Sequence, residues 1–313
     1  TALELLGDCL GAHADPTDFD LLGQRLAWAL RDYQPQPAAA YAAVLSAVTT
    51  AVWDLAGQRL GVPCWRLLGG AKARRVDCYA AGLRADDEDL ARAVKRQSER
   101  FGALQLRLCG DTERDLAAAR MFRRLLGDNA PLRVDVGATC PDAEAVLQLS
   151  QALEPLELFW LQDPLPPGDW AAWGQVSAQL PCALAGGRTL SAPEEAFGAL
   201  GEGAVDVLTP DVRLAGGLAG GRRLAALAWA RGAAVSFGGG LSPLGQLTAL
   251  HLSAATMHAG PVEVMLPREP LGGLLEPALA LQDGFLALPD GPGLGHQVSE
   301  RFISRHQVEV PSP

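Results

Sequence analysis

The sequence predicts an α/β protein whose parallel strands close into a barrel, and two patterns lead to this prediction. Short apolar runs end at residues spaced by about 26 positions, the length that one strand, one helix and two loops require. Most of these runs are apolar at nearly every position, as strands covered on both faces are. The residues that end the runs are Arg107, Asp135, Gln162, Arg188, Asp211, the apolar Phe237 and Glu263.

The region before the first strand is predicted to be helical. A periodic stretch predicts one helix from Phe19 to Leu30, and a longer apolar stretch predicts a second from Ala38 to Leu60. Gly61 stands where helices commonly end in a left-handed residue, and Pro63 follows it. This region therefore precedes the barrel as a helical unit.

Candidate strands then recur with helical patterns between them, such as the helix that ends before Gly127 and the helix from Gly220 to Arg231. Right-handed crossovers on a parallel sheet of this size close readily into a barrel. An open doubly wound sheet is the alternative, but the Gly-rich turn that it usually carries after its first strand is missing. The strands are predicted at Val76–Ala80, Ala103–Leu108, Leu132–Val136, Leu156–Leu161, Ala183–Ala185, Val205–Leu208, Ala233–Phe237 and Val262–Leu266.

Composition excludes several classes of function. The chain has 313 residues, is 49% hydrophobic and carries a formal net charge of −10, with no basic stripe, so we expect no nucleic-acid partner. Its six cysteines include no C-x-x-C pair, which indicates free thiols in a reducing compartment. Without a basic, apolar leader or a long apolar run, we expect a cytoplasmic protein with no membrane partner.

The ends of the predicted strands carry the residues with chemical potential. Asp135 and Asp211 are expected to point into one mouth of the barrel, where they suit metal binding, acid–base chemistry or structural ion pairs, and spacing alone favours the ion pairs. Between them stand Gln162, a weak neutral ligand, and Arg188, which cannot bind a metal. We therefore expect no metal or other cofactor at this mouth.

A general base is also missing from the series. Arg107 is too basic to deprotonate near neutral pH. Asp163 follows Gln162 directly, so the alternation of a strand predicts that its side chain points outward. The histidines lie away from the predicted strand ends, at His13, His251, His258, His296 and His306.

Four segments carry a family resemblance over essentially the whole chain. Ala47–Gly57 reads AVTTAVWDLAG, Leu67–Gly70 reads LLGG, Thr209–Gly217 reads TPDVRLAGG and Pro292–Gly295 reads PGLG. These segments resemble the enolase superfamily, in particular its mandelate racemase/muconate lactonizing enzyme branch. The resemblance implies a (β/α)7β barrel with an α+β capping domain, and chemistry that begins with abstraction of a proton α to a carboxylate. A magnesium ion held by three acids would stabilise the enolate.

The metal-ligand positions that the resemblance implies are largely substituted. The first acid of the family is retained as Asp135, but the asparagine two residues later is Gly137. The second acid is Gln162, before Asp163-Pro164, and the third is Arg188. Two of the three ligands are therefore replaced.

The catalytic positions that the resemblance implies are also changed. The two lysines of the second strand correspond to Gln105 and Arg107, and the catalytic histidine aligns with Phe237. The aspartate that orients this histidine is retained as Asp211, and the acid of the eighth strand is Glu263. These substitutions remove several separate requirements of the family reaction.

The resemblance also sets the expected domain organisation. Residues 1–70 correspond to the helical part of the capping domain and the lead-in to the barrel, 71–270 to the barrel, and 271–313 to an irregular segment that returns to the cap. The antiparallel sheet with which the family's capping domain opens does not lie in this sequence, nor do its substrate-selecting loops. Homo-oligomers are common in the family, so we expect one here.

The sequence leads to one main hypothesis on function and two alternatives. The main hypothesis is a barrel that has lost magnesium-dependent proton abstraction. In it, Arg188 replaces the cation and contacts Asp135 and Asp211, while Arg107 helps to bind a small carboxylate or other anion. A scaffold or regulatory role for the protein would follow. One alternative is a metal-independent racemase, isomerase or dehydratase that uses Asp211 or Asp135 as base. The other is a structural subunit assembled with intact relatives.

Overall fold

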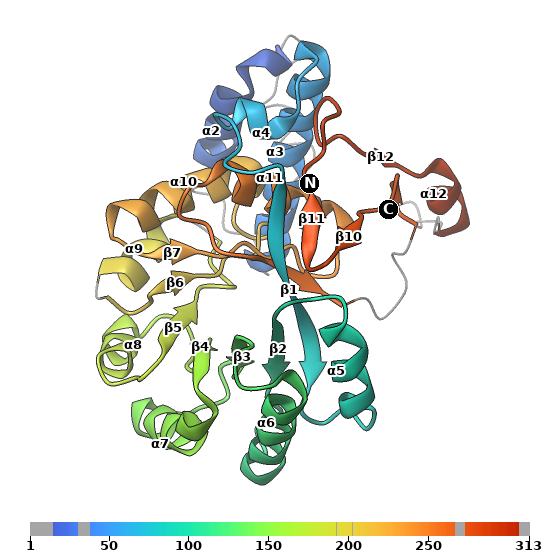
Figure 1. Cartoon of the computed structure of the whole chain (residues 1–313). Coiled ribbons are helices and arrows are strands. Elements are labelled where there is room, and N and C mark those ends of the chain that lie inside the picture. The colour runs from blue at the N-terminus through green and yellow to red at the C-terminus, as the bar shows by residue number, and fades with distance from the viewer. Residues whose placement is uncertain (1–14, 31–37, 192, 202, 267–272, 307–313) are drawn as a thin grey trace.

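The computed structural model describes residues 15–30, 38–191, 193–201, 203–266 and 273–306, and it shows a closed barrel of parallel strands with helices on its outside (Figure 1). Strands and helices alternate from β1 to β8, with one α-helix between each pair of consecutive strands. This (β/α)7β order confirms the fold class predicted from the sequence.

The barrel closes because β1 pairs with the strands at both ends of the series. β1 (Arg75–Arg84) is parallel to β2 on one side and to β8 on the other. β7 reaches β8 through parallel bridges that join Val235 to Ala259 and Gly238 to Glu263. The other barrel strands are β2 (Leu104–Arg107), β3 (Leu132–Asp135), β4 (Leu158–Gln162), β5 (Ala183–Gly186), β6 (Val207–Leu208), β7 (Ala234–Val235) and β8 (Val262–Met265).

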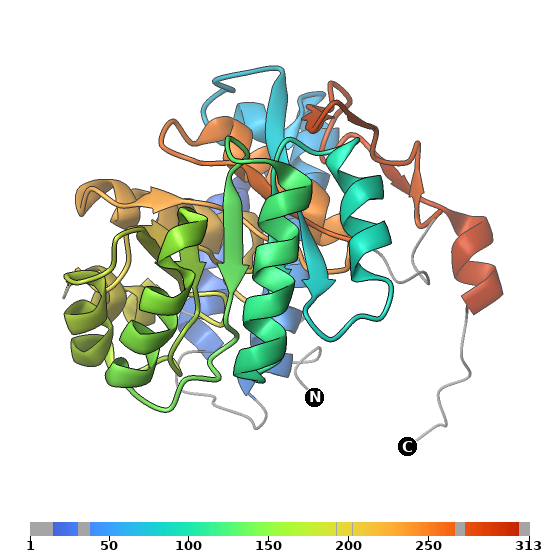
Figure 2. The ribbon, with the colours of Figure 1, turned by 60° about the horizontal axis from the view of Figure 1, so that its bottom comes forward.

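Helices cover the outer faces of the strands, as Figure 2 shows for the teal-to-green helices α5, α6 and α7. On β2, Leu104 and Leu106 face this layer and are fully buried, while the alternating Gln105 and Arg107 face the interior. The helices are α5 (Leu90–Ser98), α6 (Thr112–Leu126), α7 (Ala143–Leu153), α8 (Trp170–Ser177), α9 (Pro193–Gly201), α10 (Gly217–Ala230) and α11 (Pro243–Ala255), with the 3-10 turn η2 (Glu154–Leu156) before β4.

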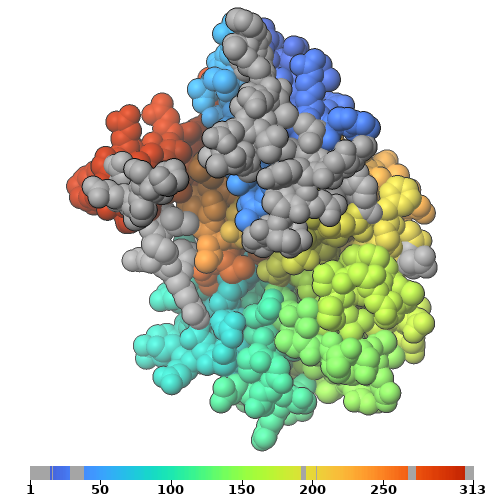
Figure 3. Space-filling model, turned by 180° about the vertical axis from the view of Figure 1, so that it is seen from behind, coloured from blue at the N-terminus to red at the C-terminus, as the bar shows by residue number. Residues whose placement is uncertain are grey.

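Helices α2 (Phe19–Leu30) and α3 (Ala38–Leu60) have the predicted bounds, and η1 (Pro16–Asp18) and α4 (Cys64–Leu67) flank them. They lie at the end of the molecule opposite α6 and α7 (Figure 3). By length and mean hydropathy, 1.4, the segment Ala39–Leu60 also meets the criteria for a membrane span. In the structure it packs against α2 and α10, with Trp53 fully buried. The predicted domain 1–70 falls partly on residues 1–14 and 31–37, outside the described residues.

Helix α10 begins at Gly217, three residues earlier than predicted. The glycines at its start allow close packing against α3. A Cβ at Gly217 would overlap the Thr50 hydroxyl of α3. The Thr49 hydroxyl donates a hydrogen bond to the Gly216 carbonyl at 3.0 Å, and the Ser46 hydroxyl accepts one from the Gly216 N–H at 2.8 Å. These glycines therefore allow two helices to approach each other.

The prediction of an irregular C-terminal segment is wrong in part. β10 (Leu281–Gln282) and β11 (Phe285–Ala287) form an antiparallel hairpin that adds to β1. Asp283 and Gly284, which connect them, both have positive φ, as the commonest two-residue hairpin turn requires. The other elements of the segment are β9 (Leu275–Glu276), β12 (Gln297–Val298) and α12 (Glu300–His306).

The buried His251 of α11 joins this C-terminal segment to α4. Its Nδ1 accepts a hydrogen bond from the Trp65 N–H at 3.2 Å, so its Nε2 carries the proton and donates to the Leu294 carbonyl at 3.1 Å. The ring is fully buried, and burial lowers the pKa of His251 to about 4. The neutral ring is therefore part of the folded structure.

We expect His251 to make stability depend on pH. Its folded pKa of about 4 lies below the ordinary value of 6.5, so the unfolded chain takes up the proton first and stability is lost as the pH falls from 6.5 through 4. The loss approaches about 3 kcal/mol. Urea unfolding midpoints should therefore fall more steeply between pH 7 and 4.5 in the wild type than in His251→Gln, whose amide does not titrate. Parallel pH profiles for the two proteins would contradict this assignment.

Candidate active site

The polar residues at the strand ends converge on one mouth of the barrel. The register of β2, β3 and β4 places Arg107 beside Asp135 and Asp135 beside Gln162. Gln105 lies two residues before Arg107 on β2, and its amide donates a hydrogen bond to the Gln162 side-chain oxygen at 2.7 Å. Arg188 follows Gly187, whose φ of 101° turns the chain after β5. The predicted residues of these four strands are thus brought together.

Arg188 is the centre of this cluster. Its Nη2 lies 2.6 Å from Asp135 Oδ2 and 3.8 Å from Glu263 Oε2, and its Nε lies 3.3 Å from Asp163 Oδ2. Burial opposes the charged form, but the fields of Glu263, Asp135 and Asp163 outweigh it and raise the pKa of Arg188. Three carboxylates therefore surround one permanent cation.

Asp163 points into this cluster, so the prediction that it faces outward is wrong. β4 ends at Gln162, and Asp163 adopts a positive φ of 43°, which breaks the alternation on which the prediction rested. Its carboxylate accepts hydrogen bonds from the Gly187 N–H at 3.2 Å and the Gln162 amide at 3.2 Å. Burial is the main cause that raises the pKa of Asp163, against the opposing field of Arg188.

Arg107 also binds Asp135, with its Nη1 2.7 Å from Oδ2. Its guanidinium lies directly against Gly137, where a Cβ would overlap it. Among the described residues Asp135 is the only hydrogen-bond partner of this guanidinium, and 32% of the Arg107 side chain is exposed. The Arg107 guanidinium is therefore fixed by Asp135, while part of the side chain stays exposed at the mouth.

The Asp211 carboxylate does not pair with the Arg188 guanidinium, so that part of the expected pairing is wrong. Its carboxylate instead binds Arg213, accepting hydrogen bonds from the backbone N–H at 2.9 Å and from Nε at 3.0 Å and also contacting Nη2. The guanidinium of Arg213 lies against Gly240, where a Cβ would overlap it. Sequence reasoning missed Arg213, although its spacing of two residues from Asp211 suits such a local pair.

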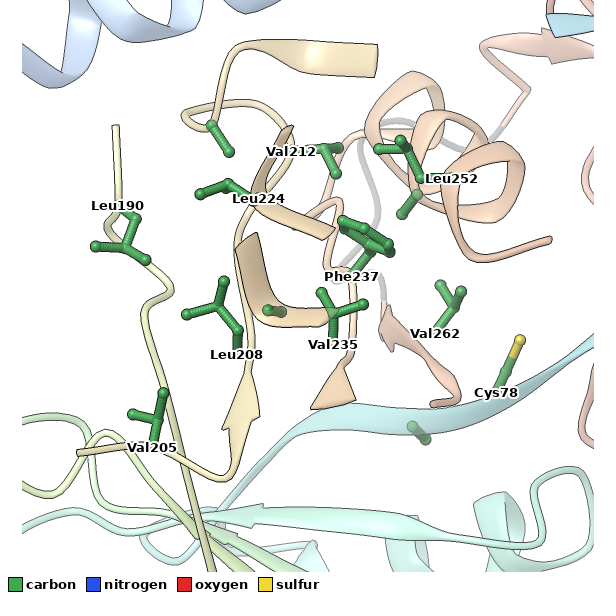
Figure 4. Close-up of a cluster of buried hydrophobic side chains, with 14 of the residues drawn as sticks. Cys78, Leu190, Val205, Leu208, Val212, Leu224, Val235, Phe237, Leu252 and Val262 are labelled. Atoms are coloured by element: carbon green, nitrogen blue, oxygen red, sulfur yellow. The ribbon is translucent and has the colours of Figure 1, made fainter. Parts of the chain in front are cut away.

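Phe237, which the resemblance aligns with the catalytic histidine of the family, does not face the mouth. Its side chain is fully buried in the layer between strands and helices, among Val212, Leu252 and Val262 (Figure 4). Beyond the end of β7, the next residue, Gly238, is the one that turns inward, where it is bridged to Asp211 and Glu263. Gly238 carries no side chain, so no imidazole stands at this position either.

Glu263 on β8 completes the cluster. Its Oε2 accepts a hydrogen bond from the Tyr79 hydroxyl of β1 at 3.4 Å, and the side chain is 8% exposed. Burial is the first cause that raises the pKa of Glu263, and the nearby carboxylates add to it, while Arg188 opposes it. Among the carboxyl groups of the mouth, Glu263 therefore lies farthest from its nearest guanidinium nitrogen, at 3.8 Å.

Below the mouth the barrel interior is filled by aromatic rings and a second buried arginine. Tyr79 and Trp160 stand edge to face at 5.4 Å, although β2 and β3 separate their strands, so the rings meet across the interior. Arg133 is 3% exposed, and its guanidinium lies 4.8 Å from the Tyr79 ring and 4.6 Å from the Trp160 ring. Burial lowers the pKa of Arg133 to about 10, so it stays charged at neutral pH.

The donor set at the mouth does not fit a magnesium ion. The three positions that would supply its ligands hold a carboxylate, a neutral amide and a guanidinium, and the guanidinium of Arg188 already occupies the place beside Asp135 that a cation would take. Within the part of the chain that the structure describes, no group of three His, Cys, Asp or Glu residues has the geometry of a metal site.

The mouth opens into a cavity of about 240 Å³, called the mouth cavity below. Arg107, Arg188 and Asp135 are among the residues that line it. This cavity is the place where a small ligand would meet the arginines. Its polar lining residues are Arg84, Gln105, Arg107, Asp135 and Arg188, and its other lining residues are Ala81, Gly82, Leu241, Met265 and Leu266.

Comparison with known proteins identifies relatives along nearly the whole chain. A D-galactarolactone cycloisomerase from Agrobacterium fabrum is 28% identical over 95% of this chain and 82% of its own length. A 3,6-anhydro-alpha-L-galactonate cycloisomerase from Streptomyces coelicolor is 30% identical over 93% and 78%. An L-talarate/galactarate dehydratase from Salmonella typhimurium is 30% identical over 96% and 73%.

Solved structures share the fold. An enolase from Agrobacterium radiobacter, bound to Na and L-malate, superposes with a TM-score of 0.88 at 27% identity, covering 99% of this chain and 86% of that one. A mandelate racemase/muconate lactonizing protein from Paracoccus denitrificans, complexed with magnesium, gives a TM-score of 0.84 at 27% identity, covering 93% and 82%.

The family assignment rests on sequence and structure together. Residues 88–302, which include all the strand-end residues described above, match the Enolase C-terminal domain-like family. The relatives match beyond this domain, over the N-terminal helices as well. The chain belongs to the enolase superfamily, in its mandelate racemase/muconate lactonizing enzyme-like branch.

Proposed function

We propose that this chain has lost magnesium-dependent abstraction of α-protons and instead binds a small carboxylate at the mouth of the barrel. The observation that carries the proposal is the position of Arg188, whose Nη2 lies 2.6 Å from the retained acid Asp135. A permanent cation there supplies the positive charge that the acids need, and it would repel a divalent ion.

Arg107 supports the second half of the proposal. Among the described residues only its Nη1 has a hydrogen-bond partner, Asp135, and the 32% exposed side chain lines the mouth cavity with donors to spare. Guanidinium groups suit carboxylates because two parallel hydrogen bonds can form at once. The Agrobacterium radiobacter relative was solved with L-malate, a carboxylate, bound to it.

Glu263 favours a second candidate function, a metal-independent isomerase or dehydratase acting on a carboxylate. Its buried carboxyl group has a raised pKa and lies 3.8 Å from Arg188, so it could exchange a proton with a ligand whose negative charge the arginines stabilise. Asp211 and Asp135, the bases considered from the sequence, are less suitable because both are already bound to arginine. The similarity to a cycloisomerase and a dehydratase supports this second candidate.

Removing Arg188 should turn the cluster into a cation site. In Arg188→Ala the carboxylates of Asp135, Asp163 and Glu263 lose their shared counterion, and stability should fall by about 2–3 kcal/mol. Millimolar Mg²⁺ should then raise the melting temperature of the variant and leave that of the wild type unchanged. Calorimetric titration of wild-type protein gives the direct check, and micromolar Mg²⁺ binding at the mouth would sink the proposal.

Adding a side chain at Gly137 should weaken carboxylate binding by displacing Arg107. Gly137→Ala places a methyl group where the guanidinium lies. Gly127→Ala is the matched control, because Gly127 also has a positive φ but open space around it. Both variants should lose about 1 kcal/mol of stability. We expect only Gly137→Ala to bind L-malate at least fivefold more weakly in calorimetry, and equal losses in both would argue against a role for Arg107.

Solvent exchange separates the two candidate functions. If proton abstraction is lost, ¹H NMR in D₂O should show no exchange of the α-protons of α-hydroxy acids and N-acylamino acids incubated with the protein. Exchange that disappears in Glu263→Gln, with Asp211→Asn as the comparison, would instead establish the second candidate.

A further inference from the structure

The mouth cavity has two chemically different walls. Its ionic wall is built on β2, β3 and the end of β5 and carries Arg107, Asp135 and Arg188. A second group of lining residues is apolar and forms the apolar wall: Met265 lies at the end of β8 and Leu266 follows it. Ala81 of β1 and Leu241, from the loop before α11, complete this apolar wall. Arg84, also of β1, lines the cavity as well, but its guanidinium is bound to Asp86.

Strand alternation turns Met265 and Ala81 of the apolar wall toward the cavity. Met265 is two residues beyond Glu263 on β8, and Ala81 is two residues beyond Tyr79 on β1, so both stand above inward-facing residues at the level of the mouth. The Met265 sulfur packs over Gly82, where a Cβ would come within 3.0 Å of it. Leu241 is 47% exposed and so has apolar surface available to a ligand.

We propose that the ligand of the mouth cavity is a monocarboxylate with an apolar body, such as an aliphatic or aromatic acid, and not a polyhydroxylated sugar acid. This proposal rests on carboxylate binding at Arg107, the proposed function. The carboxylate meets the guanidinium of Arg107, and the body lies against Met265, Leu266 and Leu241. The names of the relatives point to sugar acids, so the apolar wall sets this chain apart from that expectation.

The two ligand classes differ in what the apolar wall does to them. Each methylene group of the ligand that leaves water raises the ligand's affinity about fourfold. A hydroxyl group on the same carbon would lose its hydrogen bonds to water, because Met265, Leu266 and Leu241 offer no donor or good acceptor in return. The cavity of about 240 Å³ is smaller than the sites that hold drug-sized ligands, which suits a small acid.

Hexanoate and gluconate form a matched pair of probes, since both are six-carbon monocarboxylates and only gluconate carries hydroxyl groups. Calorimetry at low salt should show hexanoate binding at least tenfold more tightly than gluconate or acetate. Hexanamide, which lacks the charge, should bind at least tenfold more weakly than hexanoate. Equal binding of hexanamide and hexanoate would overturn the role of the carboxylate.

Two methionine variants test whether the apolar wall causes the preference for hexanoate. Met265→Gln should weaken hexanoate about fivefold and leave acetate unchanged, while Met257→Gln, at a methionine that is 76% exposed outside the mouth cavity, should change neither. Gluconate binding as tightly as hexanoate would overturn the proposed ligand class and leave carboxylate binding intact. Failure of hexanoate, gluconate and acetate alike to bind would overturn the proposed function together with this inference.

Discussion

The contact between Arg188 and three surrounding carboxylates is the interaction on which the rest of the mouth depends. Asp135, Asp163 and Glu263 come from β3, the end of β4 and β8, and the arginine comes from the end of β5. Buried carboxylates this close repel one another unless a positive charge stands between them or they take up protons. Arg188 provides that charge from within the chain, so the strand ends stay together without a bound ion.

The barrel separates the residues that build its fold from those that build its site. The outward residues of each strand, such as Leu106 and Val134, build the layer against the helices, and the inward residues at the same level build the mouth. An inward substitution therefore leaves the main hydrophobic core untouched, and the solved relatives superpose closely despite the modest identity. Conservation of this fold is weak evidence for conservation of a reaction.

Much of the fold follows from the sequence, because strand and helix periodicity depends on local patterns of apolar residues. The bounds of α2 and α3, the order of the barrel elements and the inward position of Arg107 and Asp135 could all be predicted. The C-terminal hairpin escaped because its strands are too short to show a pattern, although Asp283-Gly284 is a recognised turn signal.

Details of the site were harder to predict, since they depend on single backbone angles. The positive φ of Asp163 turns its carboxylate inward, and a shift of one residue on β7 decides whether Phe237 or Gly238 faces the mouth. The partner of Asp211 also escaped, because the choice between Arg188 and Arg213 depends on distances in three dimensions. Alternation alone fixes none of these choices.

The glycines beneath Arg107 and Arg213 make the order of substitution matter. Position 137 cannot hold a side chain while the guanidinium of Arg107 lies there, and the same holds for position 240 and Arg213. Changes at such touching positions are not additive, so we expect a side chain added at the glycine alone to cost more than the same change made together with replacement of the arginine. Each arginine and its glycine are therefore expected to act as an epistatic unit, in which a larger residue at the glycine position requires a change of the arginine first.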